Sequence, residues 1–354
     1  MNFFEVFMTT LQTEKINTAI FSSLVIILIG YFCRKRGIFD NKTGKVLTGI
    51  VLSLSLPALA YNSFMSDINQ ETLRNGMGLL VWGIAMYPIL MILTLPIFAR
   101  YKGDEKTTLR VLSIFGSTTF FGIPIVTAIY GPQGTLYASI FNIGYRIFLY
   151  SYGYIKMSGL SMKKENLKQM FLNPIVVATF LGLLVWIFQD YLPQMTVNVE
   201  QNGETIKKSV AFLRIDHTLP QLFQVFKYLG GLSSPLAWLS IGSTLGAVSF
   251  KEAFSDKKTW YYTFVKLALV PAINIAILYA LSLAGFPINL VGLGTVVIMM
   301  ATPPATVAVA YAINFDREAL LASNASLMCT LGAVLMAPVW IVIIELIGKI
   351  GVFA

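Results

Sequence analysis

Long apolar segments alternate with short polar ones along almost the whole chain. An apolar segment of about 20 residues is long enough to cross the hydrocarbon core of a bilayer as a helix. Because ten such segments are separated by charged residues, glycine or proline, the pattern predicts an all-α polytopic membrane protein with ten transmembrane helices. The predicted spans are residues 17–34, 46–65, 76–99, 108–130, 133–157, 173–191, 222–248, 259–284, 288–314 and 319–348.

The distribution of lysine and arginine predicts which side of the membrane each loop faces. Of the 26 basic residues, 17 lie in the loops that follow the first, third, fifth, seventh and ninth spans. Cytoplasmic loops carry an excess of these residues. We therefore expect a multi-pass protein of the cell (cytoplasmic) membrane with both termini outside.

Composition excludes several classes of protein. Of the 354 residues, 56% are hydrophobic and 12% are charged, whereas soluble domains carry about 25% charged residues, so the lipid bilayer is the expected surrounding. The formal net charge of +9 lies in clusters between apolar runs, which favours membrane loops over nucleic-acid binding. The single His217 lies in a polar loop, and Cys33 and Cys329 are far apart. We therefore predict no metal site, no cofactor and no enzyme active site.

The chain divides into two halves with a short connection. Residues 1–158 hold the first five predicted spans, residues 159–172 form a cytoplasmic linker, and residues 173–354 hold the other five. The linker segment 161–172 is read either as an interfacial amphipathic helix or as a plain connection. An external loop at 192–220 is the longest polar stretch; its alternation around Asn202-Gly203 is compatible with a β-hairpin or with an unstructured loop.

Two proline motifs recur at matching places in the two halves. Pro57 follows Leu-Ser-Leu in the second span, and Pro235 follows Leu-Ser-Ser in the seventh. Pro124 ends Phe-Gly-Ile-Pro in the fourth span, and Pro303 lies in Ala-Thr-Pro-Pro of the ninth. A repeat unit of five spans must insert upside down, so this spacing predicts two inverted five-helix repeats with a broken helix in each. Chance proline spacing is the alternative.

The broken helices predict a site for an anion. Proline lacks an N–H group and favours the first position of a helix, so Pro124 and Pro303 are expected to start the second halves of spans 4 and 9. Thr302 is placed to cap the later half-helix. Since the two spans run in opposite directions, two positive helix N-termini are expected to face each other near the membrane midplane.

Two basic residues lie inside predicted spans, and no acidic residue lies in the middle of one. Arg146 is near the centre of span 5, where a charge costs about 3 kcal/mol. It is expected to bind a substrate carboxylate through its guanidinium, the alternative being a structural role on broken-helix carbonyls. Lys266 is one to two turns inside span 8, and we expect it to snorkel to the cytoplasmic surface.

Small polar residues at similar depth complete the candidate site, although such residues also join membrane helices without binding ligand. Those near the breaks and Arg146 are Asn62, Ser117, Thr118, Thr119, Asn142, Tyr145, Ser234, Asn274, Thr302, Thr306 and Asn324.

Motifs along the whole chain resemble the auxin efflux carrier family, whose bacterial branch includes malate and malonate permeases. The motifs are Gly30-Tyr31, Arg34-Lys35-Arg36-Gly37, Leu56-Pro57-Ala58-Leu59, Phe120-Phe121-Gly122-Ile123-Pro124, Tyr130-Gly131, Ser234-Pro235-Leu236-Ala237, Ile241-Gly242 and Pro303-Pro304-Ala305-Thr306. The resemblance implies a crossover carrier fold, an elevator-type movement, and a carboxylate bound where helices 4 and 9 cross, beside Gly122, Pro124, Pro303 and Pro304. The family's fourth span often has Asn and Gly where this chain has Ser117 and Thr119, which places its usual Asn contact in doubt.

The sequence thus predicts a secondary carrier for a small mono- or dicarboxylate, with malate the leading candidate. A larger aromatic carboxylate is the alternative substrate, and a channel or sensor with the same fold is the alternative function. A coupling ion, H⁺ or Na⁺, is left open, as are the direction of transport and a homodimeric state.

Overall fold

The computed structural model describes residues 14–40, 42–159, 172–201, 204–247, 254–349 and 351–353. The first half comprises α2 (Glu14–Lys35), α3 (Thr43–Ile50), η1 (Val51–Ser55), α4 (Leu56–Ser63), α5 (Gln70–Ile97), α6 (Gly103–Ile114), η2 (Thr118–Gly122), α7 (Ile123–Phe148), η3 (Leu149–Gly153) and α8 (Tyr154–Ser158). The second half comprises α10 (Pro174–Phe188), β1 (Gln194–Gln201), β2 (Glu204–Ala211), α11 (Ile215–Thr218), α12 (Pro220–Gly231), α13 (Ser233–Ala247), α15 (Lys257–Phe264), η4 (Val265–Leu269), α16 (Val270–Leu283), α17 (Leu290–Met300), α18 (Thr306–Asn314) and α19 (Ala319–Gly348). The proposed amphipathic segment 161–172 lies almost wholly outside the described residues.

Within the described residues, four continuous helical segments are long and apolar enough to cross a membrane. They are Thr43–Ser63, Gln70–Ile97, Lys257–Leu283 and Ala319–Gly348. Two shorter apolar helices, α10 and α17, accompany them. The chain is therefore a mostly helical, polytopic membrane protein.

Three helices have a proline in their first turn, directly after a wide, π-helical turn. The π-helical turns η1, η2 and η4 each lead directly into a helix whose second residue is proline: Pro57 in α4, Pro124 in α7 and Pro271 in α16. A proline has no N–H to bond one turn back, and its ring clashes with the carbonyl there. The local shift to π-helical bonding is the adjustment that accommodates it.

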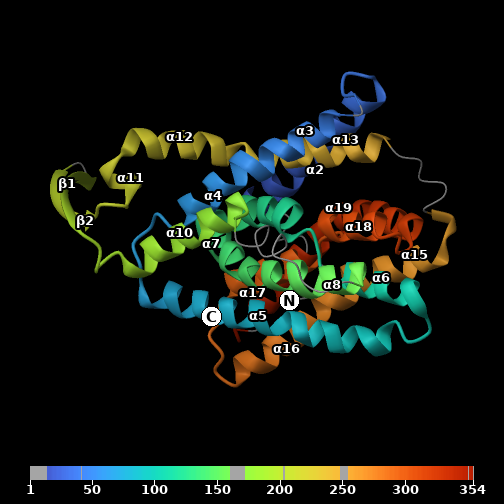
Figure 1. The fold of residues 1–354 in the computed structure, drawn as a ribbon. Coiled ribbons are helices and arrows are strands. Elements are labelled where there is room, and N and C mark those ends of the chain that lie inside the picture. Colours follow the sequence, from blue (N-terminus) through green and yellow to red (C-terminus); the bar gives the residue numbers. More distant parts are fainter. Residues whose placement is uncertain are drawn as a thin grey trace.

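The helices form two groups. In the first group, α2 packs against α13, and α4 packs against α10 and α12. Helices α2 and α13 approach closely at Gly30, where a Cβ atom would lie 2.4 Å from the Leu239 carbonyl oxygen. Glycine, which has no Cβ atom, allows such contacts between membrane helices. In the second group, α7 packs against α5 and α17, and α19 packs against α15, α17 and α18. Figure 1 shows α2, α12 and α13 along one side of the molecule and α5 and α16 along the opposite side.

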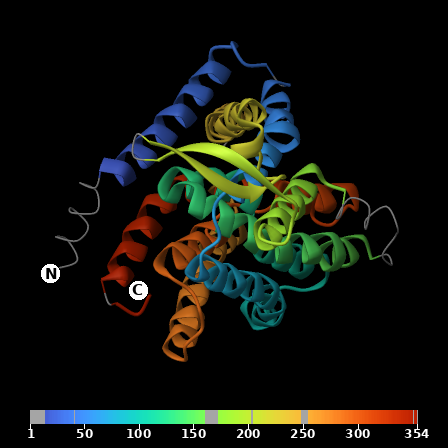
Figure 2. The same ribbon diagram turned by 90° about the vertical axis from the view of Figure 1, so that its left-hand side faces the viewer.

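A β-hairpin interrupts the helical fold within the loop 192–220. Strands β1 and β2 pair antiparallel, with Gln194 opposite Ala211 and Gln201 opposite Glu204. The hairpin lies at one end of the molecule (Figure 1) and passes in front of the helix ends when that end is viewed directly (Figure 2). Of the two readings of residues 192–220, the hairpin is the one observed, while Asn202-Gly203 lie outside the described residues.

Ion pairs attach this hairpin region to the connection between α4 and α5. Arg214 is 3% exposed and donates to Asp67 at 3.0 Å, to Asp216 at 2.7 Å and to Gln189 at 2.8 Å. Lys208 of β2 also bonds Asp67, at 2.8 Å. The hairpin therefore holds the segment through which the chain passes from the first helix group to the second.

Candidate functional site

The two interrupted helices meet at their breaks. Helix α6 ends at Ile114 and α17 ends at Met300, and both chains then become extended. The Ser117 N–H donates to the Pro303 carbonyl at 2.6 Å, and the Ala305 N–H donates to the Phe115 carbonyl at 2.8 Å. These bonds frame an antiparallel bridge between Gly116 and Pro304. We call this paired region, residues 115–117 and 301–305, the crossing.

The prolines shape the two breaks differently. Pro124 lies in the first turn of α7, as expected, although the interruption begins earlier, at Phe115. Pro303 does not start a helix: α18 begins at Thr306. A residue before a proline is kept out of the helical conformation, so the pair Pro303-Pro304 keeps this segment extended up to Ala305.

The prediction that Thr302 caps the second half-helix is wrong. The residue at the cap position of α18 is Ala305, which offers no side-chain hydrogen bond. The Thr302 hydroxyl instead donates to the Met299 carbonyl at 2.8 Å, at the end of α17. It therefore satisfies a carbonyl of the preceding helix, which is the opposite terminus from the one predicted.

Two helix N-termini open on one small cavity. A cavity of about 90 Å³, here the central cavity, is lined by Ser117 and Thr119 at the start of η2 and by Thr306 at the start of α18. The first N–H groups of a helix lack partners within it and carry partial positive charge. Thr306 is exposed to this space. The cavity therefore has the electrostatic character that an anion requires.

Arg146 adds a full positive charge to the central cavity. Its side chain is 7% exposed and lines the cavity, and its Nη2 donates to the Thr119 hydroxyl at 3.2 Å. Asn142, one turn earlier on α7, donates to the same hydroxyl at 3.4 Å. No aspartate or glutamate is among the buried residues of the described chain. The guanidinium of Arg146 has five N–H donors, and its partners, the Thr119 and Tyr150 hydroxyls, carry no charge, so it can still bind a carboxylate.

A larger cavity of about 580 Å³ adjoins the crossing between the two helix groups. It shares Ser117, Phe120 and Thr306 with the central cavity. Its lining also includes two basic residues, Arg34 and Lys45, and one acidic residue, Asp40. Its walls carry many hydroxyl groups, those of Thr48, Ser240, Ser243, Thr244, Ser326 and Thr330. We call it the vestibule, since it joins the central cavity to a basic edge of the protein.

A third cavity presents Arg146 with apolar surroundings. It has a volume of about 220 Å³ and lies between α7 and α10. Apart from Arg146, Ser139, Asn142 and Thr179, its lining is aliphatic or aromatic: Ile123, Ile143, Ile147, Ile175, Val176 and Phe180. An apolar part of a ligand held by Arg146 could lie here; we call this space the apolar cavity.

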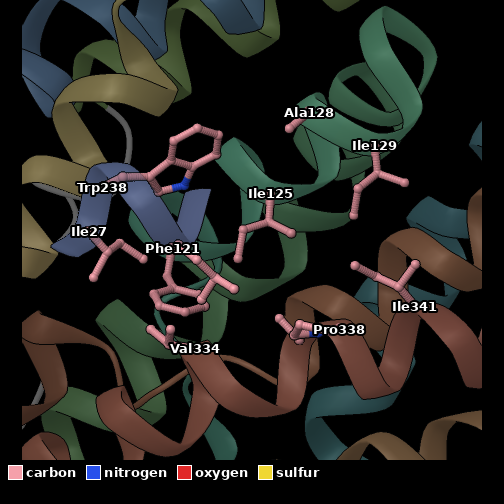
Figure 3. A pocket seen from close by; sticks show the side chains of 11 residues that line it. Ile27, Phe121, Ile125, Ala128, Ile129, Trp238, Val334, Pro338 and Ile341 are labelled. Atoms are coloured by element: carbon pink, nitrogen blue, oxygen red, sulfur yellow. The ribbon is translucent and has the colours of Figure 1, made fainter. Parts of the chain in front are cut away.

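The two helix groups also meet through apolar side chains around Phe121, which lines the vestibule as well. A narrow pocket there has a volume of about 20 Å³. Figure 3 shows Ile27 and Trp238 of the first group on one side of it and Phe121, Ile125 and Pro338 of the second on the other. An anion would lose its hydration between these apolar side chains without gaining a hydrogen bond or a positive charge, so they disfavour its passage.

Other predicted residues have different positions. Gly122 lies where a Cβ atom would be 2.6 Å from Met299 Sδ, so it permits contact of η2 with α17. Thr118 is fully buried and its hydroxyl has no hydrogen-bond partner among the described residues. Ser234 donates to the Pro124 carbonyl at 3.2 Å and joins α13 to α7. Asn62 lies in the last turn of α4 and lines neither the central cavity nor the vestibule.

Lys266 was not predicted as a site residue, and its predicted snorkelling is wrong. It is 0% exposed, and its Nζ donates to the Ser113 carbonyl at 3.0 Å at the end of α6. The hydropathy pattern predicted how deep Lys266 lies within its span, but not the face of the helix on which its side chain lies. Among the described residues, no cluster of His, Cys, Asp and Glu has the composition of a metal site.

Comparison with known proteins agrees with a membrane function. A family model described as "Membrane transport protein" matches residues 15–170 and 159–341. The chain is 22% identical over 338 residues to an uncharacterized transporter of Methanothermobacter thermautotrophicus, covering 92% of this chain and 97% of that protein. It is 25% identical over 341 residues to the uncharacterized transporter YfdV of Escherichia coli, covering 92% of this chain and 96% of that protein.

Proposed function

This chain belongs to the membrane transport protein family, and from that premise we propose that it is a secondary carrier for a small organic anion. The observation that carries the proposal is the central cavity. Two helix N-termini and the Arg146 guanidinium line it together, and no carboxylate is buried beside them in the described part of the chain. A buried positive charge without an acidic partner is costly, so a carboxylate substrate is its natural counter-ion.

We propose a mono- or dicarboxylate substrate, with malate the leading candidate. One carboxylate would accept a bidentate pair of hydrogen bonds from Arg146, and the helix starts at Thr118 and Thr306 would receive further negative charge. Around the vestibule, the hydroxyl groups of Thr48, Ser240, Thr244 and Thr330 already donate to backbone carbonyls. In the described residues those of Ser117, Ser243 and Ser326 do not, so these three would donate to a second carboxylate and a hydroxyl group. This assignment gives each polar group of a compact dicarboxylate a partner.

The apolar cavity favours a second candidate, a carboxylate with a larger aromatic body. Arg146 borders this cavity of about 220 Å³, whose other walls are mainly isoleucine, valine and phenylalanine. A ligand with a carboxylate at Arg146 and a ring against these side chains would bury apolar area at about 25 cal/mol per Å². Malate has no comparable apolar surface.

Transport is proposed to follow an elevator-type movement of the second helix group past the first. The crossing lies within the second group, where ion pairs of Arg317 with Asp104 and of Lys258 with Glu105 join α6 to its neighbours. The first and second groups meet through apolar contacts such as those of Figure 3. Few polar bonds need to break when such surfaces slide.

The membrane topology proposed for this carrier is ten spans in two inverted repeats with both termini outside. In that orientation the hairpin is external, and Arg34 and Lys45 mark the cytoplasmic end of the vestibule. The structure then represents an inward-open state, because the vestibule connects the crossing with the basic edge. The apolar pocket of Figure 3 closes the opposite route.

The proposal is tested by uptake of labelled malate, malonate and indole acetate into proteoliposomes at several pH values. Saturable uptake that unlabelled substrate accelerates by counterflow is expected of a carrier. Flux that stays linear with concentration would instead indicate a channel, and no flux of any of the three anions would contradict the assigned substrate class. Comparison of malate with indole acetate distinguishes the two candidate substrates.

A further inference from the structure

The end of α6 is closed by two side chains from one face of a neighbouring helical segment. The last carbonyl groups of a helix have no partner within it and carry partial negative charge. Tyr262 donates its hydroxyl to the Leu112 carbonyl at 3.1 Å, and Lys266, four residues later, donates Nζ to the Ser113 carbonyl at 3.0 Å. Residues four apart share a helix face, so α15 and η4 present both caps together.

The Lys266 ammonium also lies directly against the crossing. A Cβ atom built on Gly116 would be 2.9 Å from Lys266 Nζ and 2.3 Å from the Thr302 hydroxyl oxygen. Gly116 is the residue that bridges to Pro304. The ammonium therefore lies beside the point where both interrupted helices are joined, bonded to the Ser113 carbonyl oxygen. The Thr302 hydroxyl approaches the same glycine and donates to the Met299 carbonyl.

This environment is one that suits a small cation. Hard cations such as Na⁺ bind carbonyl and hydroxyl oxygens, and broken helices of carriers hold sodium ions in this way. Here the carbonyl oxygen of Ser113 accepts a hydrogen bond from a lysine side chain that is wholly buried, and the hydroxyl of Thr302 lies against the same glycine, Gly116, as the ammonium. Lys266 forms none of the ion pairs found in the described residues, so helix-end oxygens, not a carboxylate, stabilise its charge.

We infer that Lys266 is the resident cation of the crossing: its ammonium occupies the position of a coupling sodium ion, so that the carrier binds and moves its anion without sodium. The inference rests on the proposed carrier function and specifies its ion coupling. Lys266 acts through the crossing and does not line the central cavity. It is therefore a positioning residue, which holds the two helix ends in register and adds positive potential to the anion site.

The first test measures initial uptake by the wild-type protein in sodium chloride and in choline chloride of equal ionic strength. The uptake rates in the two salts are expected to agree within about twofold, because the Lys266 ammonium supplies the positive charge that a sodium ion would otherwise supply. A wild-type rate that requires sodium would overturn the inference. Absence of uptake in both salts would count against the proposed function instead, and the binding test below would then decide about Lys266.

The second test compares three variants. Lys266→Ala is expected to lose at least about tenfold of its uptake in choline, since a hydrogen bond from a charged group is removed, and to regain part of it in sodium. Lys266→Arg, which keeps the charge, and Tyr262→Phe, which removes only the neighbouring cap, are expected to remain independent of sodium. The exposed lysine of α12 gives a matched control, Lys227→Ala. Unchanged uptake of Lys266→Ala in choline would refute the inference.

A binding test does not depend on knowing the substrate. The melting temperature of purified wild-type protein is expected to be the same in sodium and choline chloride, whereas that of Lys266→Ala rises with sodium concentration, because a ligand that binds the folded state stabilises it. A sodium-dependent rise in the wild type would show that a separate sodium site exists and would overturn the inference. If Lys266→Ala does not fold, Lys266→Gln is measured in its place. The comparison of the wild type in the two salts needs no variant and tests the inference by itself.

Discussion

The backbone N–H of Ser117 donates a 2.6 Å hydrogen bond to the carbonyl oxygen of Pro303. These residues belong to the two interrupted helices, and their bond makes the breaks one structural unit. Pairing leaves the N-termini of η2 and α18 facing the central cavity while Lys266 holds the C-terminal end of α6. The positive N-terminal ends of η2 and α18 therefore face the anion site. The negative C-terminal end of α6 is turned towards Lys266, whose ammonium compensates its charge.

Replacing Gly116 tests whether this unit is needed. A Cβ atom there would meet Thr302 Oγ1 at 2.3 Å, so Gly116→Ala is expected to destabilise the protein by about 1–3 kcal/mol through overpacking and to abolish uptake. Gly231→Ala, at the end of α12 with no atom within 4 Å of the added methyl group, is the matched control. Thermal unfolding in detergent measures both; equal melting temperatures would contradict the tight crossing.

Arg146 is expected to be required for affinity. Arg146→Ala removes a charge-assisted pair of hydrogen bonds and should raise the substrate KM by at least about tenfold, whereas Arg146→Lys should retain part of the affinity because one donor remains. Arg74→Ala, at an exposed arginine in the first turns of α5, is the control. Concentration-dependent uptake gives the KM values. An unchanged KM in Arg146→Ala would show that the guanidinium has only a structural role.

Thr119 is expected to orient Arg146. Its hydroxyl accepts hydrogen bonds from Arg146 at 3.2 Å and from Asn142 at 3.4 Å. Thr119→Val keeps the shape but leaves these donors without that acceptor, so uptake should fall by about three- to tenfold. Thr119→Ser preserves the acceptor and should transport like the wild type. Equal activity of the valine and serine variants would exclude this role of the hydroxyl.

The ion pairs between Asp67 and the hairpin region predict a pH-dependent contribution to stability. Hydrogen bonds from Lys208 and Arg214 hold the pKa of the Asp67 carboxyl below its ordinary value. A carboxyl with a lowered pKa in the folded state stabilises the fold above its unfolded pKa, and this stabilisation is lost as the pH falls through the folded pKa. Asp67→Asn should therefore lower the free energy of unfolding at pH 7 by at most about 1 kcal/mol, since the carboxyl is largely exposed.

The measurement is the melting temperature of wild type and Asp67→Asn as a function of pH. The difference between them should shrink in acid and disappear once Asp67 is protonated in the folded protein. A difference that is constant across this range would mean that the charge of Asp67 does not contribute.

Local sequence signals predicted the breaks but not their pairing. Pro124 and the pair Pro303-Pro304 show where regular helical bonding is impossible, and the depth of Arg146 follows from counting residues in an apolar run. The restart of α18 at Thr306 and the bond of Ser117 to Pro303 depend on how the two chains meet in space. No pattern within one segment contains that information.

The positions of the Lys266 and Asn62 side chains could not be predicted from local sequence either. Apolar periodicity in buried membrane helices is weak because lipid and protein interior are both apolar, so the face that Lys266 presents could not be predicted. Its neighbour Gly116 gave no signal either, since its small size matters only against Thr302 and Lys266. Asn62 was chosen for its depth in span 2, but it lies at the end of α4.

The most direct test of the account is a crystal structure of the protein with a bromine-labelled carboxylate, located by its anomalous scattering. The account predicts the carboxylate in the central cavity, within about 2.7–2.9 Å of the Arg146 guanidinium, between the starts of η2 and α18. A carboxylate bound only between Trp238 and Pro338, or a metal cation held at the crossing in place of the Lys266 ammonium, would contradict it.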